Sequence, residues 1–131
     1  MLQHDYIIDM IEKFCMAVAH ALERFLFEND FKAAEDVEQA VGQLVGLDAD
    51  AAMVLDPNSL VLMFQLSGVG ESVAGYAAYA LDRLADVYED KGEAQLAQVR
   101  RSQAEAIAEA FNCDLCATPE GFEEIEQKLA Q

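Results

Sequence analysis

Apolar residues recur at steps of three and four along most of the chain, which is the spacing that gathers them on one face of a helix. Over residues 5–28 the recurring apolar positions are Ile7, Ile11, Phe14, Val18, Leu22 and Phe25. Asn29-Asp30 interrupts this pattern, and a second periodic segment occupies residues 31–45, where Gly46 offers a C-terminal cap. The two segments predict a pair of amphipathic helices joined as a hairpin.

Helix-boundary residues divide the rest of the chain. Asp48 is placed to cap a short helix, and Asp56-Pro57 is typical of an N-cap followed by proline at the first helical position. Gly92 separates two longer periodic segments, and Thr118-Pro119 predicts the start of a last helix. After the first hairpin, the expected helices are 48–55, 57–66, 71–91, 93–112 and the one opened at 118–119.

Together these elements predict an all-α fold of about seven helices, two of them short, stacked as antiparallel hairpins in a single domain over residues 1–131. A chain of 131 residues is long enough to bury a core of its own. The residues predicted to form that core include Ile11, Phe14, Leu22, Phe25, Val41, Leu44, Leu84, Tyr88, Ala97 and Phe111.

The hairpin predicted over 71–112 resembles a tetratricopeptide repeat, a helix–turn–helix unit in which small residues let two helices approach and an aromatic fills the space behind them. Arg101 and Glu109 depart from the pattern, since an aromatic and a proline are usual there, and this indicates a capping or irregular unit. The matching positions are Leu84, Ala85, Tyr88, Gly92, Ala97 and Ala104.

The first hairpin fits the same template, with Phe25 as the aromatic and Ala34 as the packing alanine. The segments 5–12 (DYIIDMIE) and 44–48 (LVGLD), with the later hairpin, are similar to a family of small bacterial proteins of uncharacterised function that have tetratricopeptide-like helices. This resemblance implies a helical-repeat fold and brings no substrate or catalytic motif.

Charge limits the classes of partner. The chain carries 25 acidic and 8 basic residues, a net charge of −17, which argues against nucleic acid because binding to phosphates needs clustered Lys and Arg. The apolar runs are too short for a membrane helix, and the N-terminus lacks the pattern of a secretion signal. We expect a soluble, cytoplasmic protein without a membrane partner.

The Cys113-Asp114-Leu115-Cys116 segment is a C-x-x-C pair, which occurs in zinc sites and redox motifs. A structural zinc ion needs four ligands, for which only His4 and His20 remain, and a redox pair is expected in an α/β context. We therefore expect neither zinc nor a catalytic disulfide, with a metal or redox protein as the minor alternative. No catalytic constellation or cofactor motif is recognised, so the chain is predicted not to be an enzyme.

The favoured function is that of a helical scaffold that binds a peptide or protein segment, with a preference for a basic one. The alternative is a self-associating structural protein, a homodimer that covers apolar end faces. The resemblance to tetratricopeptide repeats places the groove on the first helix of each pair. It implies as partner-binding residues Met16, Glu23 and Phe27 of the first hairpin and Tyr79, Asp82, Asp86, Glu89 and Asp90 of the second.

Overall fold

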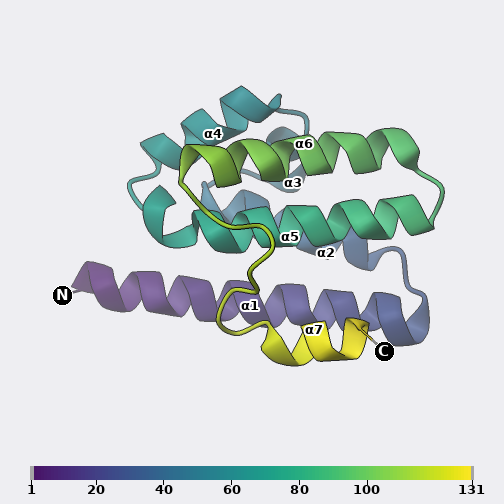
Figure 1. Ribbon diagram of the computed structural model, residues 1–131. Helices are drawn as coiled ribbons and strands as arrows, with labels where there is room; N and C mark the ends of the chain where they lie inside the picture. The colour runs from purple at the N-terminus through teal and green to yellow at the C-terminus, as the bar shows by residue number, and fades with distance from the viewer. Residues whose placement is uncertain (1, 131) are drawn as a thin grey trace.

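The computed structural model describes the backbone of residues 2–130 and the side chains of residues 5–130, and this part of the chain is helical without any strand (Figure 1). The all-α prediction is therefore confirmed. The seven helices are α1 (Leu2–Glu28), α2 (Ala33–Leu44), α3 (Ala49–Met53), α4 (Pro57–Leu66), α5 (Gly70–Asp90), α6 (Ala94–Ala110) and α7 (Glu123–Leu129).

Two helical hairpins form the body of the molecule. α1 packs against α2, α5 packs against α6, and α2 also contacts α5, so that the second helix of the first hairpin joins the two pairs (Figure 1). The short helix α3 lies on α2, and α4 covers α6. α7, yellow in Figure 1, returns from the far end of α6 to lie beside α1.

One continuous core receives side chains from all seven helices. α5 supplies small residues, which let α6 approach closely, because an alanine side chain keeps two helix axes near each other. The buried alanines of α5 are Ala74, Ala77, Ala78, Ala80 and Ala85. Of the predicted core, the fully buried residues are Phe14, Leu22, Val41, Leu44, Leu84 and Ala97. The partly buried ones that pack against the core are Ile11, Phe25, Tyr88 and Phe111.

Local signals explain most helix boundaries. The Asp48 carboxylate accepts a hydrogen bond of 2.8 Å from the backbone N–H of Ala51, which caps α3 as predicted. Pro57 occupies the first turn of α4. At the junction of α4 and α5, a Cβ on Gly70 would lie 2.4 Å from the backbone oxygen of Phe64, so that only glycine fits this close approach.

The predicted start of the last helix is wrong. Thr118-Pro119 opens a turn, closed by a 3.1 Å hydrogen bond from the N–H of Phe122 to the oxygen of Pro119, and α7 begins only at Glu123. Gly121 has φ +104°, a left-handed conformation that suits glycine, and it turns Phe122 into the core. Burial of this phenylalanine therefore decides where the helix starts. Within the described residues, no helix combines the length and the apolar character needed to cross a bilayer.

Candidate functional site

α7 lies in a seat made by α1 and α5. Phe122 and Ile125 point into it and are fully buried. The Phe122 ring stacks on Tyr79 of α5 with centroids 4.4 Å apart, and Tyr76 of the same helix lies 6.3 Å from it. On the α1 side, a Cβ on Gly121 would lie 3.3 Å from the sulfur of Cys15. These residues of α1 and α5, together with the polar ones below, are called the α7 seat.

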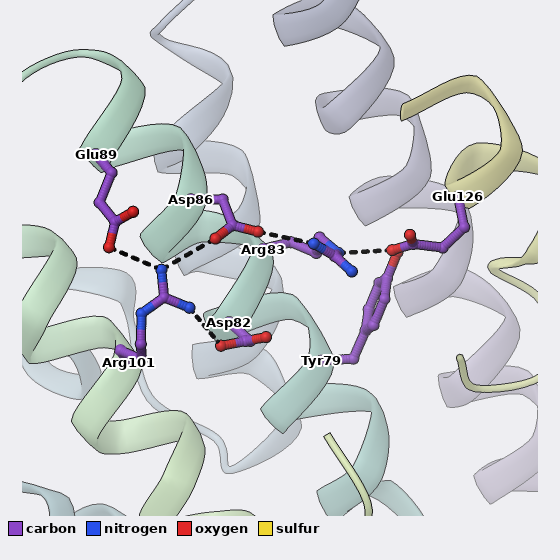
Figure 2. A network of polar contacts seen from close by, with 7 residues as sticks. All are labelled: Tyr79, Asp82, Arg83, Asp86, Glu89, Arg101 and Glu126. Atoms are coloured by element: carbon purple, nitrogen blue, oxygen red, sulfur yellow. Dashed lines mark hydrogen bonds and ion pairs between the residues drawn. The ribbon is translucent and has the colours of Figure 1, made fainter. Parts of the chain in front are cut away.

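A polar trio ties α7 to α5. The Tyr79 hydroxyl and the Arg83 Nε each donate a hydrogen bond of 2.6 Å to the same oxygen of Glu126 (Figure 2). Burial raises the pKa of Tyr79, and the neighbouring Glu126 carboxylate adds to that shift. The tyrosine therefore stays a hydrogen-bond donor throughout the physiological range of pH.

A second polar contact ties α7 to α1. The Lys128 ammonium donates a 2.9 Å hydrogen bond to Glu23, which raises the pKa of Lys128. Glu23 of α1 and Tyr79 of α5 are both predicted groove residues, one from each hairpin. In the structure both contact the same segment, which is the chain's own helix α7.

Beyond the C-terminal end of α7, the space between α1 and α5 continues as an open pocket of about 410 Å³. We call this the adjoining pocket. Its acidic rim includes Asp90, for which residues 5–130 provide no hydrogen bond or ion pair. The apolar walls come from Leu22, Phe25, Leu26, Phe31, Val87 and Leu129.

The remaining acidic residues predicted on α5 are paired within the molecule. Arg101 of α6 reaches Asp82 at 2.8 Å and Asp86 and Glu89 at 3.0 Å (Figure 2). Asp86 also meets Arg83 at 2.7 Å. Burial raises the pKa of Asp82, although the Arg101 charge opposes this shift. Arg101, the residue that departs from the repeat pattern, thus pairs with three of the four acids predicted on this face.

Three predicted residues lie outside this arrangement or differ from their expected role. Tyr79 is expected as an exposed apolar anchor, but only 4% of it is exposed, because Phe122 covers its ring. Met16 and Phe27 are exposed on α1, and neither lines the adjoining pocket.

The sequence analysis missed the residues that α7 contributes. Phe122, Ile125 and Glu126 follow the pattern F-x-x-I-E, in which an aromatic, an aliphatic three positions on and an acid next to it share one helical face. That spacing was a usable signal of an amphipathic segment. The misplaced helix start concealed it, because it put Phe122 in the middle of an acidic helix.

A second, more deeply buried polar group lies on the other side of α5. Glu38 of α2 accepts hydrogen bonds from the Tyr88 hydroxyl at 3.0 Å and from Arg100 at 2.9 Å. Arg100 also donates to the backbone oxygen of Met53, the last residue of α3, and Gln103 donates to that of Leu55, just after the helix. No buried side-chain polar atom of this group lacks a partner, which fits a structural role.

The three cysteines are unpaired. Cys113 and Cys116 lie in the turn after α6, as the sequence indicated, and burial raises the pKa of Cys15 to about 11. Among the side chains of residues 5–130, no group of three or more His, Cys, Asp or Glu is placed to hold a metal ion.

Comparisons with protein-family models, with curated proteins and with solved structures gave no match. The resemblance to a tetratricopeptide-like bacterial family therefore stays a prediction that rests on the residues alone.

Proposed function

We propose that the protein is a non-catalytic helical scaffold that binds a peptide or protein segment between α1 and α5. One observation carries the proposal: this space already holds a helical segment, the chain's own α7, and it continues into a pocket that α7 leaves open. α1 and α5 are the first helices of the two hairpins, the helices that line the groove in tetratricopeptide repeats.

The adjoining pocket suits an apolar side chain of the partner. Phe25, Leu26 and Val87 offer an apolar wall, and binding energy concentrates where an aliphatic or aromatic anchor fills such a concave site. An amphipathic helix laid in a groove is one of the recurring ways in which proteins recognise peptides.

The charge of the rim favours a cation next to that anchor. Asp90 is exposed at the pocket without an ion-pair partner among the described residues, so it is available to a Lys or Arg of the partner. Asp82, Asp86 and Glu89 are held by Arg101 and act mainly through the long-range field of a chain of net charge −17. The three free thiols suit a reducing compartment, which supports a cytoplasmic location.

A homodimer is the second candidate, because α1 exposes apolar side chains near its N-terminal end. Tyr6 and Ile8 are exposed there, and Tyr6 lines a pocket of about 240 Å³ between α1 and α2 with Met10 and Leu44. Sedimentation at micromolar concentration, with Tyr6→Glu as the comparison, tests this candidate: a dimer that the substitution dissociates would support it.

A matched pair of variants tests the proposed binding site. Leu26 and Leu96 are both leucines on helices and both 39% exposed, but only Leu26 lines the adjoining pocket. We expect Leu26→Glu to lose a protein that wild type and Leu96→Glu both capture by affinity purification and mass spectrometry. If the folded Leu26→Glu protein keeps every partner at wild-type yield, the partner does not bind in this pocket.

A further inference from the structure

We propose that α7 is an intramolecular competitor for the groove, and that the partner is an amphipathic helix of the same pattern, which enters by displacing it. This inference rests on the proposed function and names the class of ligand. The pattern is an aromatic residue, an aliphatic residue three positions later and an acidic residue directly after it, as in Phe122, Ile125 and Glu126.

The α7 seat selects this pattern by its chemistry. The Tyr79 ring offers a stacking surface, and the Tyr79 hydroxyl and the Arg83 guanidinium converge on one carboxylate oxygen (Figure 2). If a segment without a carboxylate took the place of α7, Arg83 would keep its pair with Asp86, but the buried Tyr79 hydroxyl would lose its acceptor, and a polar group left unpaired on burial is costly. The α7 seat therefore favours a ligand with an acidic residue at this position, although the molecule as a whole is strongly acidic.

The seat also orients the ligand. Gly121 lies against Cys15 and Lys128 is bonded to Glu23, so α7 runs in the same direction as α1, with its acidic contact toward α5 and its basic contact toward α1. A partner helix in the same direction would carry its next apolar side chain past Leu129 and into the adjoining pocket, which α7 itself does not fill. The partner can thereby make a contact that the competitor lacks.

Two features of α7 favour its exchange, its shortness and its exposed connection. It has seven residues, far fewer than a helix needs for stability by itself, and no side chain caps its N-terminus. The connection over residues 111–122 is irregular and mostly exposed. Segments of this kind open at a lower cost in free energy than the bundle that carries them.

The covalent connection sets the strength of the competition. A short tether gives its segment an effective concentration on the order of millimolar at a nearby site. A free helix of equal affinity therefore binds the wild-type protein poorly, and it binds well once the docking of α7 has been weakened.

A peptide with the sequence of residues 117–131, labelled with a fluorophore, tests this by anisotropy against the full-length protein. We expect the Phe122→Ala/Ile125→Ala variant to bind it at least ~10-fold more tightly than wild type, because the tethered competitor has lost its anchors. The matched control peptide, which carries Phe122→Ala, should bind neither protein. Should the double variant fail to fold, Glu126→Arg gives a second route, since it sets a positive charge against Arg83 and leaves the core side chains of α7 unchanged.

Alkylation of Cys15 reports the release of α7 independently of binding. Gly121 lies against this sulfur, whereas Cys116 is exposed and serves as an internal control. We expect Cys15 to react ~10-fold faster in the double variant, with Cys116 unchanged.

Two results would overturn the inference. One is a Cys15 rate that stays at the wild-type value in the variant; the other is a fast Cys15 rate without gain in peptide affinity. Neither result affects the Leu26→Glu comparison, so the proposed function would stand or fall separately.

Discussion

The two sides of α5 carry the same trio of residues in different settings. Toward α2 and α6, Tyr88 and Arg100 donate to Glu38, and the paired side chains of Arg100 and Glu38 are only 6% and 12% exposed. Toward α1, Tyr79 and Arg83 donate to Glu126, and the corresponding exposures are 32% and 22%.

This difference shows that the element that carries the acid decides what such a trio does. Glu38 belongs to a 12-residue helix of the first hairpin that also packs against α5, so its trio is part of the body of the bundle. Glu126 belongs to a 7-residue helix at the end of an exposed connection. The same hydrogen bonds thus hold α2, α5 and α6 together in one case, and in the other they attach a short terminal helix to α5.

The largest difference between the two trios is expected when the arginine of each, Arg100 or Arg83, is replaced by alanine. Arg100→Ala leaves Glu38 buried without its counter-ion, which should lower the free energy of unfolding by about 3–5 kcal/mol. Arg83→Ala should cost about 1 kcal/mol or less, since the more exposed Glu126 can turn to water. Urea denaturation followed by circular dichroism measures both, and equal losses would mean that burial does not separate the two trios.

Packing of the α5–α6 hairpin can be tested at Ala97 of α6, which is buried. The alanine is buried, so Ala97→Leu should overpack the α5–α6 hairpin at a cost of about 1–3 kcal/mol. Ala94→Leu is the control, because Ala94 is exposed on the same helix. Thermal denaturation that shows Ala97→Leu to be as stable as the control would contradict the close packing of this hairpin.

The group of Tyr88, Glu38 and Arg100 predicts that the free energy of unfolding falls at alkaline pH. Burial, reinforced by the Glu38 carboxylate, raises the pKa of Tyr88 to about 12, from an ordinary value of 10.0. Between these pH values Tyr88 is deprotonated in the unfolded chain but still protonated in the folded protein. The contribution of the Tyr88 hydroxyl to the free energy of unfolding is therefore complete below pH 10 and is lost as the pH rises toward 12. Tyr88→Phe should therefore flatten the stability curve in this window by about 1 kcal/mol.

Urea midpoints at pH 9 and 11 measure the effect, and Tyr6→Phe, a change at an exposed tyrosine, should leave the wild-type slope intact. Part of the slope should remain in Tyr88→Phe because burial also raises the pKa of Tyr79.

The smallest expected effect belongs to the surface arginine that pairs with three carboxylates. Arg101→Ala should cost about 0.5–1 kcal/mol, as its pairs with Asp82, Asp86 and Glu89 are largely accessible to solvent. The loss should be greatest at low salt, where both the attraction of Arg101 for the three acids in wild type and the repulsion among them in the variant are least screened. Melting temperatures at 20 mM and 500 mM salt measure this, and a loss that is as large at 500 mM would contradict it.

The sequence predicted the hairpins well because their signals are local. Apolar spacing acts within one or two turns of a helix. The boundary residues act over the same short range, and each lies at or next to the boundary that it predicted: Asp48, Pro57 and Gly92. Thr118-Pro119 failed as a helix start because a distant contact, Phe122 on Tyr79, determined the outcome.

The candidate site was predictable only in part, for the same reason. The repeat pattern selected Glu23 and Tyr79, and both do line the space between α1 and α5. A sequence shows charges without their pairing, however, so it could not reveal that Arg101, 19 residues from Asp82, would pair with three acids of this face. Nor could it reveal that the chain's own C-terminal helix would occupy the seat.

The hydrogen bonds at the end of α3 have a consequence for the order of folding. This helix has five residues, and its terminal carbonyl region is completed by Arg100, which lies 47 residues from Met53 along the chain, and by Gln103, which lies 48 residues from Leu55. Contacts that are close in sequence form before those that must close long loops. We therefore expect the hydrogen bonds from Arg100 and Gln103 to form late in folding, so that removing them should speed unfolding while leaving the rate of folding nearly unchanged.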